Sequence, residues 1–147
     1  MRPALLLLIA ATLAACSNRW ESAEPIELQF RLARERAQEG LTPIPLDGTR
    51  VNLYLHDEVL LSNEHLESAR TGKQDGKPVV ELTFNRAGSR KLEDVTLENK
   101  GQRLAVVLDS ILVSAPRIDD VITNGRTVIT GDFSEADVKA IAKRLQP

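Results

Sequence analysis

The sequence predicts an α+β domain in which two to three helices pack on one face of a mostly antiparallel sheet. Three observations support this fold class. Several short stretches alternate apolar and polar residues, which is the pattern of half-buried strands. Other stretches repeat apolar residues at helical spacing behind residues that cap helices. The two kinds of element interleave along the chain, and a tight turn between two apolar runs indicates antiparallel neighbours.

The first part of the chain predicts a targeting segment rather than a fold. Arg2 precedes an apolar run and then Leu13-Ala-Ala-Cys16, the order of a signal peptide over residues 1–15. The run is too short for a transmembrane span of ~20 residues. Its ending resembles the bacterial lipobox, which implies that Cys16 becomes the lipidated first residue of the mature protein. The alternative is an ordinary secretory signal that ends at Cys16 by chance.

Lipidation would account for the only cysteine, which has no partner for an intramolecular disulfide. A multiply acylated Cys16 would anchor a small domain firmly to a membrane. Ser17 follows it and, by resemblance to enterobacterial lipoproteins, slightly favours the outer membrane over the inner one. We expect residues 16–25 to be a lipidated tether. Trp20 within it would lie either at the lipid interface or, alternatively, in solvent or at the edge of the core.

From residue 26 to 147 we expect a single domain. Three alternating stretches predict strands: Ile26–Arg31, Val51–His56 and Val80–Phe84. Three polar or turn-rich segments predict irregular structure: Arg34–Glu39 as a loop or short helical turn, Leu41–Gly48 as a linker, and Thr71–Pro78 as a loop. Three capping residues predict helices: Ser62 for a helix through Ala69, Asn85 for a helix that ends near Gly101, and Ser134 for the last one.

The stretch from Gly101 to Phe133 carries the clearest strand signals. Leu104–Leu108 is apolar on both faces and predicts a central strand. Asp109-Ser110 then predicts a tight hairpin turn into Ile111–Val113, and Pro116 ends that strand. Asn124-Gly125 predicts a type I′ turn before a strand over Val128–Thr130. The last helix has a capping box of Ser134 with Asp137, and its apolar residues lie at helical spacing: Val138, Ile141, Ala142 and Leu145.

Seven segments carry a resemblance in their order along the chain: Ile26–Arg31, Leu60–Leu66, Pro78–Asn85 with Gly88, Thr96–Asn99, Gly101–Asp109, Val113–Pro116 and Ile129–Phe133. Together they resemble the periplasmic head subdomain of SecD, a protein-export subunit also found fused as SecDF. The resemblance covers the chain after Glu24. It implies the fold of that head and a role in engaging a translocating polypeptide or a partner protein. Relatives commonly have Asp-Gly where this chain has Asp109-Ser110.

Full-length SecD also has transmembrane helices and a base subdomain, through which the family couples proton-motive force to late steps of protein translocation. No stretch after Cys16 is long and apolar enough to span a bilayer. We therefore expect that this chain does not conduct protons itself. Only the binding role of the head carries over by resemblance.

The sequence holds little that indicates catalysis. His56 and His65 lack metal-ligand spacing and are expected on the solvated surface. Ser114 with His56 is the one combination that would suit a Ser-His-Asp assembly, although no nucleophile-elbow pattern surrounds it. Asp109 and Asp119-Asp120 are expected to be turn residues rather than cation ligands. We therefore predict no catalytic residue, no metal and no cofactor.

The composition excludes one class of binding partner. The chain has 147 residues, a net charge of −2 and only 3% aromatic residues, with Lys and Arg scattered, so a nucleic-acid partner is excluded. The leading hypothesis is a non-enzymatic, lipid-anchored, periplasm-facing envelope protein whose edge strands bind a translocating polypeptide or an export partner. Its alternatives are a docking subunit of an envelope complex unrelated to export, and a small periplasmic hydrolase. The sequence sets no oligomeric state.

Overall fold

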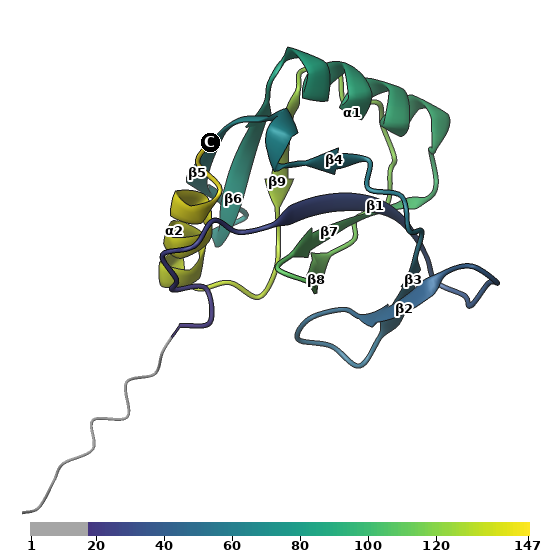
Figure 1. Cartoon of the computed structure of the whole chain (residues 1–147), viewed down its shortest axis with the longest axis horizontal. Coiled ribbons are helices and arrows are strands. Elements are labelled where there is room, and N and C mark those ends of the chain that lie inside the picture. The colour runs from purple at the N-terminus through teal and green to yellow at the C-terminus, as the bar shows by residue number, and fades with distance from the viewer. Residues whose placement is uncertain (1–17) are drawn as a thin grey trace, which may run out of the picture.

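A computed structural model describes residues 18–147 as two antiparallel sheets and two α-helices (Figure 1). The strands are β1 Leu28–Arg34, β2 Thr42–Pro45, β3 Asn52–Leu55, β4 Leu61–Ser62, β5 Leu66–Gln74, β6 Lys77–Phe84, β7 Arg103–Leu108, β8 Ile111–Ser114 and β9 Arg126–Ile129. The helices are α1 Arg86–Glu98, α2 Glu135–Arg144 and the 3-10 turn η1 Asn63–His65. The predicted α+β class is confirmed, but its strands form two sheets rather than one.

The larger sheet has the order β2-β3-β1-β7-β8, with β4 also paired to β1, and the smaller sheet has the order β5-β6-β9. β7 lies between β1 and β8 and is buried on both faces, as its sequence predicts. Its hairpin to β8 turns at Asp109 and Ser110, whose φ angles are 45° and 68°. Positive φ at both positions is the geometry of a type I′ turn, so the predicted hairpin is confirmed.

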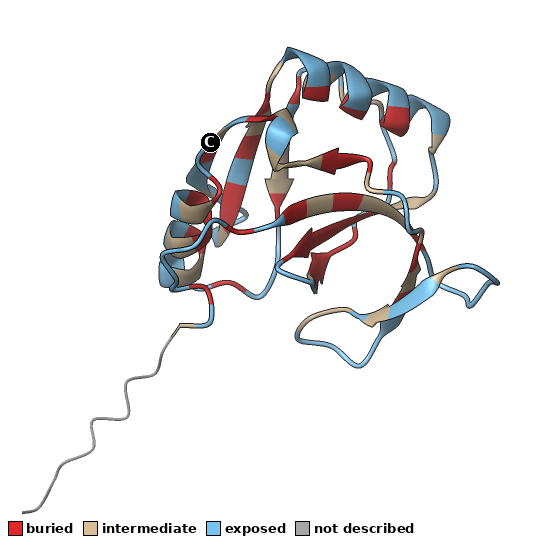
Figure 2. Cartoon of the chain, in the orientation of Figure 1, coloured by how far each residue is buried: buried red, intermediate tan, exposed pale blue. Residues whose placement is uncertain are grey.

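Two apolar clusters hold the sheets and helices together (Figure 2). The larger one lies between the sheets and takes side chains from both helices: Leu92 and Val95 of α1, and Val138 and Ile141 of α2. The smaller one covers the opposite face of β7 with Leu53 and Leu55 of β3, beside Ile44 of β2. Both helices therefore bury their apolar faces in the same cluster, whereas the β2–β3 hairpin covers the other face.

Two of the three predicted helices form at their predicted caps. The Asn85 side chain accepts a hydrogen bond from the Gly88 amide at 2.9 Å, which begins α1. The Ser134 hydroxyl accepts one from the Asp137 amide at 3.1 Å, and the Asp137 carboxylate accepts the Ser134 amide in return at 2.7 Å. This reciprocal pair is the predicted capping box of α2.

The predicted helix from Ser62 to Ala69 is wrong. Ser62 begins only the short turn η1, and the chain is extended from Leu66 onward in β5. The buried residues Leu66 and Ala69 are three apart, a spacing that fits a helix. β5 pairs with β6 along its length, so its backbone groups are satisfied by the sheet instead.

Two predicted irregular segments are also strands. The segment Leu41–Gly48 contains β2, which tolerates two prolines because it is an edge strand of the sheet. The predicted loop Thr71–Pro78 belongs mostly to the β5–β6 hairpin and turns only at Asp75 and Gly76, with φ of 50° and 76°. Asp-Gly is a strong signal for this two-residue turn, so the hairpin was predictable from its sequence.

The predicted type I′ turn at Asn124-Gly125 is wrong. Gly125 has a φ of 64°, but Asn124 is outside the left-handed region. The Asn124 side chain instead accepts a hydrogen bond from the Arg126 amide at 3.1 Å. This Asx-type bond redirects the chain into β9, whose partner is the distant strand β6 rather than the preceding segment.

The N-terminal segment is packed against the domain from Trp20 onward. The Trp20 side chain is 1% exposed, and its ring meets the Phe133 ring edge-on with centroids 6.3 Å apart. Arg144 of α2 donates hydrogen bonds to the carbonyls of Trp20, at 3.3 Å, and Glu24, at 2.8 Å. Of the two positions considered for Trp20, the lipid interface does not agree with this burial, and the ring lies inside the core rather than in solvent or at its edge. The predicted domain boundary at residue 26 falls inside the packed structure. The predicted signal peptide and Cys16 lie outside the described residues.

Candidate functional site

β9 is an edge strand of the smaller sheet and leaves backbone groups free. Phe84 of β6 donates its amide to the Gly125 carbonyl at 2.9 Å, and the antiparallel register continues from there. Because the hydrogen-bonding direction alternates along an antiparallel strand, Thr127 and Ile129 face β6 and the backbone of Val128 faces away. Within residues 18–147, no strand pairs with that edge. An edge of this kind is a template for another extended chain.

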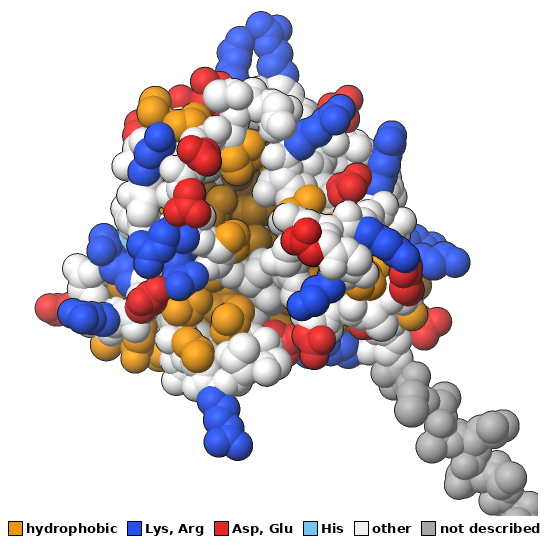
Figure 3. All heavy atoms as spheres, turned by 180° about the vertical axis from the view of Figure 1, so that it is seen from behind, with side chains coloured by type: hydrophobic (Ala, Val, Ile, Leu, Met, Phe, Trp, Pro, Cys, Tyr) orange, Lys and Arg blue, Asp and Glu red, His pale blue; other side chains and the backbone are white. Residues whose placement is uncertain are grey.

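An apolar cleft of about 340 Å³ adjoins β9. Its apolar lining comes from both sheets and the segment after β8: Phe30, Leu104, Val106, Ile118, Ile122 and Val128. Figure 3 shows apolar side chains at the bottom of a hollow in this face of the molecule. A cleft beside a free strand edge can receive the side chains of an added strand while the edge pairs with its backbone.

The segment that follows β8 is fixed in place as one wall of the cleft. Ile118 donates its amide to the Gln102 carbonyl at 2.8 Å, and Gly101 donates its own to the Ile118 carbonyl at 2.8 Å. Further along, the Ile122 amide donates to the hydroxyl of Thr96 at 3.0 Å. Thr96 is a buried residue of α1, so the helix holds this wall as well as the core.

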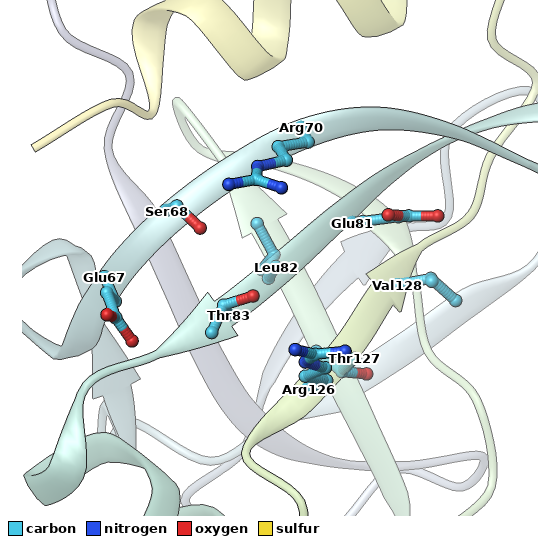
Figure 4. A pocket seen from close by; sticks show the side chains of 9 residues that line it. All are labelled: Glu67, Ser68, Arg70, Glu81, Leu82, Thr83, Arg126, Thr127 and Val128. Atoms are coloured by element: carbon cyan, nitrogen blue, oxygen red, sulfur yellow. The ribbon is translucent and has the colours of Figure 1, made fainter.

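A second hollow of about 630 Å³ lies on the outer face of the smaller sheet (Figure 4). Arg70 and Glu81 project here from β5 and β6, and Arg126 and Val128 from β9. Its lining is mixed in charge and mostly polar. β9 thus contributes residues to two hollows, and no strand among residues 18–147 pairs with its outer edge.

The residues that we considered for catalysis are not brought together. His65 accepts the Ser62 amide on Nδ1 at 3.2 Å and is only 15% exposed, so its predicted solvated position is wrong. His56 is half-buried rather than solvated. Ser114 is buried, and neither its hydroxyl nor the Nε2 atom of His56 has a hydrogen-bond partner among residues 18–147. The two side chains therefore do not form a nucleophile and base pair.

The aspartates have structural or peripheral positions. Asp109 accepts the Glu27 amide on Oδ1 and the guanidinium of Arg144 on Oδ2, both at 2.8 Å, so it is a turn residue with a packing role. Asp119 and Asp120 are exposed at the rim of the apolar cleft. Among the described residues, no three His, Cys, Asp or Glu side chains cluster as metal ligands would.

Ion pairs connect the N-terminal segment to the chain after β2, and α2 to β5. Arg19 forms a bidentate pair with Asp47, which lies just after β2. The hydrogen bond from Arg19 is the main cause that lowers the pKa of Asp47. Lys73 of β5 contacts Glu135 of α2 at 2.9 Å, and this bond raises the pKa of Lys73. These pairs lie outside the cleft, so we assign them to the fold.

A family described as "SecDF, P1 head subdomain" matches residues 38–147. The chain belongs to this family. It is 34% identical over 134 residues to the protein translocase subunit SecD of Rickettsia typhi, an alignment that covers 82% of this chain and 26% of that protein. It is 44% identical over 88 residues to SecDF of Thermus thermophilus, with 59% of this chain and 12% of that protein covered.

Solved structures place the fold in the same family. A SecDF structure, described as a membrane component that enhances protein export, matches with a TM-score of 0.68 and 32% identity, over 84% of this chain and 63% of that one. A crystal structure of SecDF in its super-membrane-facing form matches with a TM-score of 0.67 and 33% identity, over 82% of this chain and 18% of that one. The predicted resemblance to the SecD head is confirmed.

The chain spans about a quarter of the length of the SecD protein from Rickettsia typhi. Within residues 18–147, no helix has both the length and the apolar character needed to cross a membrane. The cleft beside β9 was not predicted from the sequence. Its residues are distributed over β1, β7, β9 and the segment after β8, so only the pairing of the strands brings them together.

Proposed function

We propose that this chain is a non-enzymatic, lipid-anchored protein of the cell envelope whose SecD-head domain binds an extended polypeptide. The observation that carries the proposal is the free edge of β9 beside an apolar cleft. A bound chain would pair with the backbone of Val128 and place alternate side chains in the cleft. The relatives are named as protein translocase subunits, which makes a polypeptide in transit the natural ligand.

The peptide site is tested at Val128, whose amide faces away from β6. Val128→Pro removes that donor without removing a bond of the β6–β9 ladder, and Val128→Thr is the matched control that keeps it. We expect the proline variant to bind a fluorescein-labelled apolar nonapeptide roughly tenfold more weakly in an anisotropy titration, as the loss of one backbone hydrogen bond implies. Equal affinity of both variants and the wild type would remove the edge of β9 from the proposal.

The cleft is tested separately at Ile122. Ile122→Asp places a carboxylate among apolar side chains and should weaken binding of the same peptide, because an apolar ligand side chain would then meet an unpaired charge. Val51→Asp, on an exposed residue that is not part of the cleft, is the control. Photo-crosslinkers at Ile122 and Val128 in cells then identify the ligand. Adducts to many secreted chains support an export-linked role, whereas one dominant envelope protein supports the docking-subunit alternative.

The lipid anchor would hold this domain very near its membrane. Trp20 is fixed in the core, and only Ser17, Asn18 and Arg19 separate it from Cys16. At ~3.5 Å per extended residue this segment reaches roughly 15 Å. We propose that the domain faces the periplasm, with the outer membrane favoured by Ser17. Cys16→Ser should abolish labelling by radioactive palmitate and release the protein from the membrane fraction, and retention of both would refute the anchor.

A further inference from the structure

Four arginines line a hollow of about 600 Å³ where β1 ends: Arg34, Arg36, Arg103 and Arg117. Glu35 is the only carboxylate in its lining, although the chain as a whole has a net charge of −2. The opposite end of β1 adjoins the Asp109 turn, because Leu28 pairs with Leu108 there. Figure 3 shows Lys and Arg side chains gathered at the left of this face, next to the central apolar hollow.

Two of these arginines are held in position before any ligand arrives. Arg103 and Arg117 are opposite each other in an antiparallel bridge. Like charges in such a pair repel and destabilise a sheet. Each guanidinium is nevertheless fixed by a backbone carbonyl: Arg103 donates to Ala115 at 2.9 Å, and Arg117 donates to Gly101 at 3.1 Å.

The hollow already binds a carboxylate, which the chain itself supplies. Oε1 of Glu35 accepts bonds from Nε and Nη2 of Arg103, at 2.8 and 2.6 Å, and is 3.8 Å from Nη2 of Arg117. The hydrogen bond from Arg103 is the main cause that lowers the pKa of Glu35. Arg34 and Arg36 have no carboxylate within 4.0 Å among residues 18–147. The hollow therefore has more guanidinium groups than its one carboxylate can pair.

Arg117 connects this hollow to the apolar cleft, since it lines both. Further along the same segment, Asp119 and Asp120 line the cleft and would repel a carboxylate. One wall of the cleft therefore has a guanidinium that it shares with the arginine hollow, followed along the chain by two carboxylates. A ligand that spans the cleft would meet the two signs of charge at different positions along its length.

We infer that the polypeptide bound in the cleft carries acidic side chains at one end, and that the arginine hollow holds them in competition with Glu35. This inference rests on the proposed function and names the class of polypeptide that the site prefers. Guanidinium groups recognise planar carboxylates through paired hydrogen bonds. The Glu35 side chain is 57% exposed, so an acidic side chain of a ligand can reach the guanidinium groups that Glu35 contacts.

The test uses three labelled nonapeptides with the same apolar residues. The first carries two Glu at one end, made in both orientations, the second carries Gln instead, and the third carries the two Glu in the middle. We expect one orientation of the first peptide to bind roughly three- to fivefold more tightly than the second and third peptides do. This difference in affinity should be lost at high salt. The third peptide has the same net charge as the first, so a general attraction would not separate them.

Matched variants assign the effect to the hollow. Arg34→Gln with Arg36→Gln should abolish the preference for Glu, whereas Arg90→Gln, an exposed arginine of α1, should leave it unchanged. Glu35→Gln removes the internal competitor and should tighten binding of the first peptide about threefold. Glu39→Gln removes an equal charge from the same loop without freeing an arginine and should have a smaller effect.

Three results would overturn the inference. Equal affinity for the Glu and Gln peptides would refute it while the proposed peptide site stands. Failure of every peptide to bind would refute both. Retention of the wild type by phosphatidylglycerol vesicles, lost in the Arg34 and Arg36 double variant, together with no preference among the peptides, would assign the arginines to lipid phosphates.

Discussion

Replacement of Trp20 by alanine tests whether the N-terminal segment belongs to the domain. Trp20 is the only tryptophan, is 1% exposed and packs edge-on against Phe133. Burial of an aromatic ring of ~250 Å² at ~25 cal/mol/Å² gives an upper limit of about 6 kcal/mol, and measured losses for such truncations are about 3–5 kcal/mol. Because the site is near a chain end that can relax, we expect Trp20→Ala to lower the free energy of unfolding by about 3 kcal/mol.

Urea denaturation followed by circular dichroism is the appropriate assay, since the variant lacks the fluorophore. The corresponding fall in melting temperature would be on the order of 10 °C for a domain of this size. Leu97→Ala is the control, because Leu97 is 59% exposed on α1 and its truncation should change stability by no more than about 0.5 kcal/mol. A loss under about 1 kcal/mol for Trp20→Ala would show that residues 18–25 behave as the free tether that the sequence predicted. Ready quenching of wild-type tryptophan fluorescence by acrylamide would lead to the same conclusion.

Three further predictions concern single interactions. Ser110→Gly should be neutral or stabilise the protein by up to about 0.5 kcal/mol, because relief of the left-handed φ of 68° is partly offset by the flexibility of glycine, and a clear fall in melting temperature would contradict the turn geometry. Arg144→Met should cost about 2–3 kcal/mol in a urea titration, whereas Lys143→Met on the exposed side of α2 should cost little. The pair with Arg19 lowers the pKa of Asp47, so its stabilisation is present above pH ~4 and lost as the pH falls further, and Asp47→Asn should flatten the decline in stability seen there by acid titration.

The elements that a few neighbouring residues specify were predicted correctly. The apolar run of β7 and the capping box at Ser134 are complete within a few residues, and both elements form as predicted. β2 and β5 were missed because local signals were misleading: the prolines of β2 indicated a linker, and the apolar spacing at the start of β5 indicated a helix. Both segments are strands because β3 and β6 pair with their backbone groups. The sequence left two positions open for Trp20 for a similar reason, since its neighbours Phe133 and Arg144 lie at the other end of the chain.

The candidate site was beyond prediction because it depends on topology. Val128 was predicted to lie in a strand, but only the pairing of β9 with β6 shows that one edge of this strand is free. The arginine hollow likewise combines Arg34 and Arg36 from the end of β1 with Arg103 and Arg117 from later in the chain. These arginines are far apart in the sequence, which argued against a basic surface for nucleic acid. The pairing of β1 with β7 and the bridge between Arg103 and Arg117 bring them together.

The contrast between two arginines distinguishes a structural role from a binding role. Arg144 is 8% exposed, and its guanidinium donates to two carbonyls and to Asp109, so it has few donors left for a ligand. Arg117 is 53% exposed, and its Nη2 atom is 3.8 Å from the Glu35 carboxylate, which Arg103 also contacts. A guanidinium with five donors and one hydrogen bond of 3.1 Å, to Gly101, retains most of its binding capacity. We therefore expect truncation of Arg144 to change stability, and truncation of Arg117 to change the affinity for acidic peptides.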